Sequence, residues 1–281
     1  MNKFQIKTID FQSDDAPAKL AKSLRNTGFA VVNNHGIDKN LINDVYEEWS
    51  SFFKSDKKNN YLFDIEKQDG YFPLKSENAH GCYQKDLKEF YHIYLPWGRI
   101  PKEITEQTLN LRHNLVDIGT TLLTWIDDNT PGDIRKTFSM PLKDMIKESQ
   151  NNLLRVLHYP PLKGDEDSEA LRAAAHGDIN LITILLSGSE PGLQVMNMNK
   201  EWIDVESDNG WLIINSGDML NKCSKDFYPS TIHRVINPKD SENRSRYSMP
   251  LFLHARDEVI ISEKYTAKSY LDKRLKSLGL K

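Results

Sequence analysis

One histidine and one aspartate, two residues apart, are the first side chains in this sequence whose spacing suggests chemistry. His176 and Asp178 lie in the segment AAAHGDINLITILL. At the mouth of a β-strand, residues two apart project to the same side, so the imidazole and the carboxylate can share a ligand. The chain has 8 His and 40 Asp and Glu among its 281 residues, a composition in which roughly one His-x-acid triplet arises by chance. The pair alone therefore fits a solvated turn as well as it fits a site.

A second histidine, 57 residues later, adds to this pair. His233 lies in the predicted strand STIHRVIN, where a lone histidine is more often a core residue than a ligand. Together, however, two imidazoles and one carboxylate can occupy one face of an octahedral metal and leave three positions open, as in non-haem Fe(II) oxygenases. A structural zinc site would be closed and would favour cysteine. The ligand types therefore favour a catalytic metal site made of His176, Asp178 and His233.

Another polar pair begins thirteen residues after His233. Arg246 and Ser248 lie in RYSMPLFLH, and on a strand this spacing puts the guanidinium and the hydroxyl on one face. Such a pair can bind a carboxylate through charge-assisted hydrogen bonds. Tyr159, in LLRVLHYPPL, can add a hydroxyl to the same carboxylate. The residues alone leave open a surface arginine on an edge strand and a core tyrosine at a strand end.

Short strands must position these residues, and they dominate the chain after residue 150. Runs rich in β-branched and aromatic residues alternate there with turn sequences such as SGSEPG and SDNG. Seven such strands at roughly ten-residue spacing predict a sandwich or jelly roll. The seven runs are LLRVLHY, NLITILL, LQVM, EWIDV, WLIIN, STIHRVIN and RYSMPLFLH.

Helices are predicted mainly in the first half of the chain. A helix with Asp14 or Asp15 as its N-cap ends at Gly28, and the strand FAVV follows it. Residues 60–104 contain several Gly and Pro and predict loops with short strands. No linker rich in Pro, Gly or Ser separates helices from strands, so we expect the helices to pack on the outside of the β core. Three further helices are predicted from apolar stripes, namely Leu41, Val45, Trp49 and Phe52; Leu111, Leu115, Ile118, Leu122 and Trp125; and Leu271, Leu275 and Leu278.

The composition excludes several classes of protein. The 37 Lys and Arg against 40 Asp and Glu give a formal net charge of −3, which argues against a strongly basic nucleic-acid-binding surface. The 2 cysteines are too few for a disulfide framework. The first residues lack the apolar stretch of a signal peptide, and no apolar run approaches the length of a membrane span. We expect a cytoplasmic protein, in a reducing compartment, without a nucleic-acid or membrane partner; the oligomeric state stays open.

The order of these motifs resembles one known family. SLRNTGFAVVNNHGI, DGYFPL and KEFYHI are similar to the N-terminal region of the iron- and 2-oxoglutarate-dependent dioxygenases of the isopenicillin N synthase-like superfamily, also called the iron/ascorbate oxidoreductase family. LLRVLHYPPL, HGDINLITILL, GLQVMNMNKEWIDV, WLIINSGDML, STIHRVINP and RYSMPLFLH follow in that family's order. The resemblance covers nearly the whole chain, and such a collinear set of motifs is highly specific.

The resemblance implies a mostly β fold with flanking helices around a double-stranded β-helix, a jelly-roll variant. It implies one catalytic domain over 1–281, with an N-terminal dioxygenase region (1–104), a helical segment (105–150), the metal and co-substrate core (151–258) and a C-terminal helix (259–281). The expected cofactors are Fe(II) and the co-substrate 2-oxoglutarate, with ascorbate as a possible reductant. His176, Asp178 and His233 would bind iron.

The resemblance also implies an activity. Arg246 and Ser248, assisted by Tyr159, would hold the distal carboxylate of 2-oxoglutarate. The enzyme would then oxidise, usually hydroxylate, a small-molecule substrate with dioxygen, releasing succinate and CO2; desaturation and ring closure stay open. Two alternatives remain, namely a non-haem iron oxidase of the same fold that does not use 2-oxoglutarate and a non-catalytic metal-dependent binding protein. Candidate substrate contacts, each more often a packing residue, are Tyr83, Arg155, Phe252 and His254.

Overall fold

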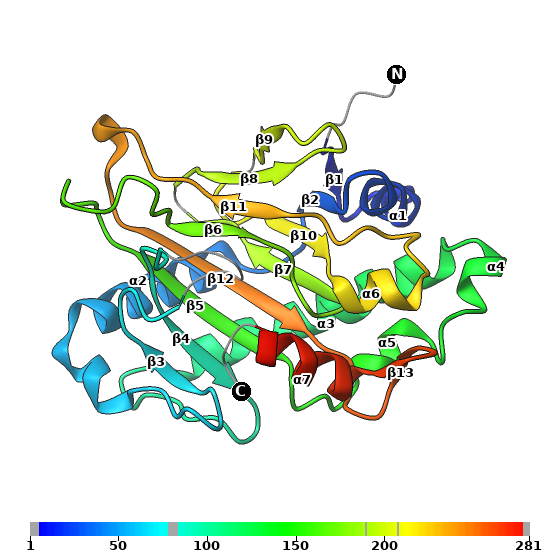
Figure 1. Ribbon diagram of the computed structural model, residues 1–281, viewed down its shortest axis with the longest axis horizontal. Coiled ribbons are helices and arrows are strands. Elements are labelled where there is room, and N and C mark those ends of the chain that lie inside the picture. Colours follow the sequence, from blue (N-terminus) through cyan, green and yellow to red (C-terminus); the bar gives the residue numbers. More distant parts are fainter. Residues whose placement is uncertain (1–5, 78–83, 189, 207, 278–281) are drawn as a thin grey trace.

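The computed structural model of this protein describes residues 6–77, 84–188, 190–206 and 208–277. Two β-sheets face each other as a jelly roll, and the smaller sheet lies above the larger one in Figure 1. The larger, major sheet contains, in spatial order, β1 (Thr8–Asp10), β2 (Phe29–Asn33), β10 (Leu212–Ser216), β7 (Ile182–Leu186), β12 (Arg246–Leu253), β5 (Leu153–Tyr159), β4 (Glu89–Tyr94) and β3 (Gly70–Phe72). The minor sheet contains β6 (Ala173–His176), β11 (His233–Val235), β8 (Leu193–Met196) and β9 (Trp202–Asp204). The predicted double-stranded β-helix with flanking helices is confirmed.

The major sheet has an apolar face on each side, because side chains alternate along its strands. On β10, Leu212 and Ile214 belong to a large core that the sheet shares with the helices. Ile213 between them belongs to a smaller core, together with Leu157 of β5 and Val235 of the minor sheet. The smaller core thus fills the space between the two sheets.

Helices cover the outer face of the major sheet, where α3 packs on β7 and β12 and contacts α1 and α2 (Figure 1). None of the helices in the described ranges combines the length and the hydropathy that a membrane span requires. The helices are α1 (Ala16–Thr27), α2 (Lys39–Lys54), α3 (Glu106–Asp128), α4 (Gly132–Arg135), α5 (Leu142–Ile146), α6 (Asp218–Cys223) and α7 (Ala267–Ser277). The short elements are the 3-10 helices η1 (Asp56–Tyr61) and η2 (Asp240–Glu242) and the hairpin β13 (Ile260–Ser262) and β14 (Tyr265–Thr266).

The turn after α1 needs glycine for two reasons. Gly28 ends the helix with a φ of 72°, in the left-handed region that favours glycine. A Cβ atom at this position would also lie 2.2 Å from Oγ1 of Thr231, two residues before His233. At the other end of α1, Asp15 occupies the N-cap position but its side chain makes no capping hydrogen bond, because it accepts from Ser13 and pairs with Lys19.

The C-terminal helix is shorter than the predicted segment 259–281, because residues 260–266 form the hairpin β13–β14 and α7 begins at Ala267. It also packs through other residues than the predicted stripe. Ala267 and Tyr270 are the buried side chains of α7, whereas Leu271 and Leu275 of the predicted stripe are only partly buried. Leu278 lies outside the described residues. The first turn of α7 therefore holds the helix against the rest of the protein.

Candidate metal and co-substrate site

The two predicted histidine ligands lie side by side on neighbouring strands of the minor sheet. His233 of β11 is the direct antiparallel partner of His176, the last residue of β6, and the two ring centres are 4.4 Å apart. Asp178 follows in the turn after β6. Its Oδ1 lies 3.9 Å from Nε2 of His176 and 3.8 Å from Nε2 of His233. Among the described residues, this is the group of three whose possible ligand atoms all lie within 4.8 Å of one another.

Backbone hydrogen bonds orient both imidazoles. Nδ1 of His176 lies 2.7 Å from the carbonyl oxygen of Ala174, and Nδ1 of His233 lies 3.2 Å from that of Thr231. A carbonyl can only accept, so Nδ1 is the donor in each ring and Nε2 is left to face a metal ligand position. Burial, and then the neighbouring His233, lower the pKa of His176 to about 4. His176 therefore presents a neutral nitrogen donor, and Nε2 of both rings faces Asp178.

The carboxylate of Asp178 is held by the other sheet. Its Oδ2 accepts hydrogen bonds from Oγ1 of Thr183 on β7 at 2.5 Å and from Nδ2 of Asn215 on β10 at 2.8 Å. Burial alone would raise the pKa of Asp178, but the two imidazoles and these two hydrogen bonds outweigh it, so the pKa lies below its ordinary value. Oδ1 is left facing the two histidines.

These three groups fit an iron ion. Metal ions contact nitrogen and oxygen donors at about 2.0–2.2 Å and hold adjacent donors about 3 Å apart, so the observed separations require only a small contraction. The set contains two imidazoles, one carboxylate and no thiolate, which is the facial set of non-haem Fe(II) enzymes. Each donor also has a hydrogen bond on its other polar atom, as ligands in metal sites usually do.

Arg246 and Tyr159 are direct partners in the antiparallel pair of β12 and β5. Arg246 is 3 % exposed, and its guanidinium lies over the ring of Tyr159, 5.2 Å from the ring centre. Nε donates to the carbonyl of Glu190 at 3.0 Å, but the buried Nη1 has no hydrogen-bond partner among the described residues. A buried donor without a partner is costly, so an oxygen acceptor belongs beside Nη1. Ser248, two residues further on, is 2 % exposed.

One cavity between the sheets brings most of the predicted site residues together. Its lining includes the six predicted ligand and co-substrate residues and two of the predicted substrate contacts, namely His176, Asp178, His233, Arg246, Ser248, Tyr159, Arg155 and Phe252. His254 is not part of this lining. Alternate residues of β12 reach the cavity up to Phe252, but the strand ends at Leu253, and the N–H of His254 donates to Oδ1 of Asn152. Tyr83 lies outside the described residues.

A charged cluster borders the cavity beside Arg155. Nε of Arg155 lies 2.7 Å from Nε2 of His92, and its Nη1 lies 3.4 Å from Glu77. Lys88, which also lines the cavity, pairs with Glu77 at 3.0 Å and with Asp86 at 2.7 Å. Burial alone would lower the pKa of Lys88, but the two carboxylates raise it above its ordinary value. The two cations and two carboxylates balance, so the cluster forms a neutral wall.

The sequence interpretation missed the residues that support Asp178. Thr183 and Asn215 lie in NLITILL and WLIIN, which were predicted only as strands. A polar residue inside an apolar strand was the available signal, because buried polar groups need partners. Lys88 and Phe29 also line the cavity and were not predicted to do so. Lys88 lies in KEFYHI, which was used only as a motif of the family resemblance.

Two family models match this chain. The model of the 2OG-Fe(II) oxygenase superfamily matches residues 150–255, and the model described as non-haem dioxygenase in morphine synthesis N-terminal matches residues 6–113. A jelly roll with two histidines and an aspartate at one cavity is the arrangement of mononuclear non-haem iron oxygenases.

Solved structures agree with this class. A Shewanella oneidensis protein assigned as an oxygenase is 48% identical, with a TM-score of 0.89, over 98% of this chain and 99% of that chain. A Caulobacter crescentus protein assigned to the 2OG-Fe(II) oxygenase family is 30% identical, with a TM-score of 0.79, over 96% and 98%. JOX2, solved in complex with 2OG, Fe and JA, is 25% identical, with a TM-score of 0.76, over 92% and 77%. The chain belongs to the 2OG-Fe(II) oxygenase superfamily and is a non-haem dioxygenase whose family cofactors are iron and 2-oxoglutarate.

Proposed function

We propose that this protein oxidises a small-molecule substrate, by hydroxylation, and converts 2-oxoglutarate to succinate and CO2. The observation that carries the proposal is the buried guanidinium of Arg246. It lies in the same cavity as the three metal donors, and its Nη1 has no partner among the described residues. A dicarboxylate that reaches from the metal to Arg246 would satisfy this donor by a charge-assisted hydrogen bond.

In this proposal, each group of the chain has one task. His176, Asp178 and His233 bind iron, while Arg246 and Ser248 hold the distal carboxylate of 2-oxoglutarate beside the ring of Tyr159. Iron with 2-oxoglutarate and dioxygen supplies the oxidising chemistry, as in related enzymes. Apolar side chains of the cavity exclude water around these groups, namely Leu157, Leu185, Leu193 and Val235.

The substrate would bind between Arg155 and the aromatic rings of Phe29 and Phe252, which line the same cavity. Two guanidinium nitrogens of Arg155 face His92 and Glu77, and its Nη2 can donate to a carbonyl or carboxylate oxygen. The surrounding charges balance, so this wall suits a substrate with a polar oxygen without requiring a negative charge. JOX2 was solved with the small ligand JA, which supports a small molecule as the substrate.

An anaerobic titration with Fe(II), with and without 2-oxoglutarate, tests the proposal. We expect the weak visible charge-transfer band of the chelate only when both are present, and succinate after air is admitted. Replacing His176, Asp178 or His233 by Ala should abolish the band. His158→Ala is the control, because His158 contacts Glu89 and Ser245 and does not line the cavity.

Two other results would contradict the proposal in different ways. Oxygen consumption with ascorbate but without succinate would identify an iron oxidase that does not use 2-oxoglutarate. Iron binding with neither succinate nor oxygen consumption, across a panel of candidate substrates, would identify a non-catalytic metal-dependent binding protein.

A further inference from the structure

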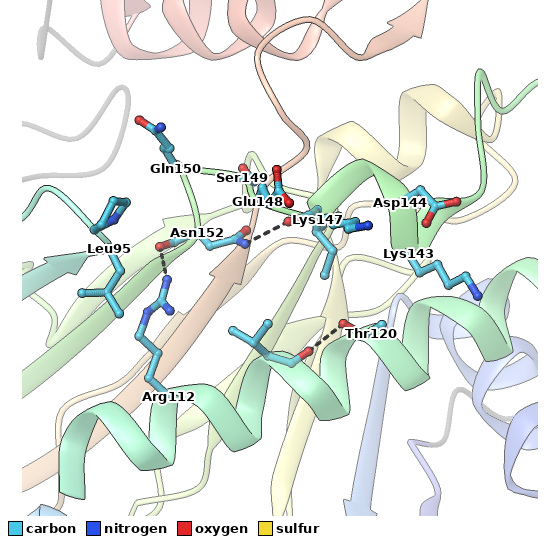
Figure 2. A pocket seen from close by; sticks show the side chains of 13 residues that line it. Leu95, Arg112, Thr120, Lys143, Asp144, Lys147, Glu148, Ser149, Gln150 and Asn152 are labelled. Atoms are coloured by element: carbon cyan, nitrogen blue, oxygen red, sulfur yellow. Dashed lines mark hydrogen bonds between the residues drawn. The ribbon is translucent and has the colours of Figure 1, made fainter. Parts of the chain in front are cut away.

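A second cavity lies between α3 and α5 with the segment that follows it (Figure 2). It shares no lining residue with the cavity that holds the metal donors. Its volume is about 620 Å³, within the range of small-molecule sites in proteins. This cavity plays no part in the function proposed above.

A buried arginine lies at the base of this cavity. Arg112 of α3 is 9 % exposed, and Figure 2 shows its side chain reaching from the helix towards Asn152. Nη2 donates to the carbonyl oxygen of Asn152 at 3.0 Å, while Nε has no hydrogen-bond partner among the described residues. No ion pair joins Arg112 to a carboxylate in the described part of the chain. A buried cation without an anionic partner costs free energy that an anionic ligand would recover.

The rest of the lining combines apolar and charged side chains. The charged ones are Lys143, Lys147, Asp144 and Glu148, so with Arg112 the lining carries three positive and two negative charges. The apolar ones are Leu95, Pro96, Val116 and Ile146. A ligand that suits both parts has one negative charge and an apolar body.

We propose that this cavity binds a small organic monocarboxylate, with its carboxylate against Arg112 and its apolar body against Val116 and Ile146. Arginine suits this role because its planar fork matches the two oxygens of a carboxylate. The site is separate from the 2-oxoglutarate site, so it does not depend on the assignment of Arg246.

The test uses 2-naphthoate as the probe and 2-naphthamide as its neutral isostere. The full-length protein is titrated with each by calorimetry. We expect 2-naphthoate to bind at least tenfold more tightly than the amide, and Arg112→Gln to weaken naphthoate binding at least tenfold. Arg112→Lys should recover part of the loss, since it restores the charge but not the fork. Arg246→Gln should leave naphthoate binding unchanged.

A second variant tests the cavity without removing the arginine. Thr120 lines the cavity, and its hydroxyl donates only to the carbonyl of Val116 in its own helix. Thr120→Trp should fill the space and abolish naphthoate binding while Arg112 stays in place. The matched control is Thr121→Trp, one position further along α3 and outside the lining, which should bind the probe as wild type does.

Four results with the wild type, Arg112→Gln and Thr120→Trp would overturn the proposal. They are absence of naphthoate binding to wild type, equal affinity for acid and amide, unchanged binding in Arg112→Gln, and wild-type binding in Thr120→Trp. Loss of naphthoate binding in Arg246→Gln would show that the probe occupies the inner cavity, and would also overturn it. Failure of the proposed dioxygenase activity would appear instead as absence of succinate, which this binding test does not measure.

Discussion

Asn215 of the major sheet donates a hydrogen bond to Oδ2 of Asp178 at 2.8 Å, and Oδ1 of the same carboxylate faces the histidines of the minor sheet. The aspartate therefore lies between the two sheets and contacts both. Its orientation depends on side chains that never reach a metal themselves.

This relationship predicts that Asn215→Ala and Thr183→Val weaken Fe(II) binding by about 10- to 100-fold, the usual cost of losing a group that orients a metal ligand. Each variant removes one hydrogen bond to Oδ2 of Asp178. Anaerobic Fe(II) titration measures the effect. Thr124→Val is the control, because that hydroxyl bonds only to Thr120 within α3. Unchanged iron affinity in both site variants would show that Asp178 does not need this support.

The guanidinium of Arg246 predicts a specific loss of co-substrate affinity. Arg246→Gln should weaken 2-oxoglutarate binding by a charge-assisted contact of about 1.5–3 kcal/mol, or about ten- to more than a hundredfold. Arg246→Lys should recover only part of this, and Ser248→Ala should cost about 1 kcal/mol because its donor is neutral. The measurement is the 2-oxoglutarate dependence of succinate release, with iron affinity followed in parallel.

The control for these variants is Arg234→Gln. Arg234 lies on the minor sheet, stacks on Trp202 and bonds to Gln194, so its loss should leave the 2-oxoglutarate constant unchanged. If Arg246→Gln behaved like Arg234→Gln, the distal carboxylate would have to bind elsewhere.

Gly28 predicts a difference between two glycine substitutions. Gly28→Ala should destabilise the fold by about 2–3 kcal/mol, because it adds backbone strain and a contact with Thr231. Gly36→Ala is the matched control, since Gly36 has a φ of +82° but nothing within 4 Å of the added Cβ; it should cost about 1 kcal/mol. Urea unfolding measures both. If both substitutions lowered the free energy of unfolding equally, the turn at Gly28 would have to shift enough to accommodate the added methyl group.

His254 predicts a pH-dependent contribution to stability. Burial lowers its pKa from 6.5 to about 4, so the unfolded chain binds a proton in this interval that the folded protein excludes. Stability therefore falls as the pH falls from 6.5 towards 4. His254→Gln should remove about 2–3 kcal/mol of this fall. Urea unfolding of the metal-free protein between pH 4.5 and 8 measures it.

The matching control for His254 is His113→Gln, which replaces an exposed histidine of α3 whose side chain is 77% exposed. It should leave the pH profile of unfolding unchanged. If His254→Gln kept the wild-type pH profile of unfolding, the pKa of His254 in the folded protein would not be lowered.

The strands were predictable because each carries its own local signal. All seven predicted runs contain strands, since β-branched residues, alternation and turn residues lie within a few positions of one another. β6 was missed because its sequence AAAH has no β-branched or aromatic residue. Its strand conformation comes from pairing with β11, a partner more than fifty residues away. Pairing over that distance leaves no local trace.

The site was predictable in residue type but only partly in geometry. The spacing of His176 and Asp178 suggested two side chains on one strand face, whereas Asp178 lies beyond the end of β6. Its backbone carbonyl accepts from the N–H of Asp218, at the start of α6, at 2.8 Å. This contact joins segments forty residues apart. The stacking of the Arg246 guanidinium on the ring of Tyr159 was not predictable either, because it depends on the pairing of β12 with β5. The role expected for the Tyr159 hydroxyl stays a prediction.

Arg112 shows a further limit of the sequence. An arginine within an amphipathic helix usually extends into solvent, so its type and position gave no reason to expect a buried charge. The segment after α5 covers it, and that packing depends on the tertiary fold.

The placement of Asp178 between the sheets also concerns the lifetime of the protein. On the proposed assignment, the minor sheet supplies the histidines while the major sheet supplies Arg246 and Ser248. Iron and co-substrate would therefore bind to residues of both sheets, and ligands that bind only the folded state raise its stability by mass action. A newly made chain in an iron-poor cell would lack this stabilisation, so it would unfold more often and be cleaved more readily by proteases. Iron supply would then set how much of the protein persists as well as how fast it works.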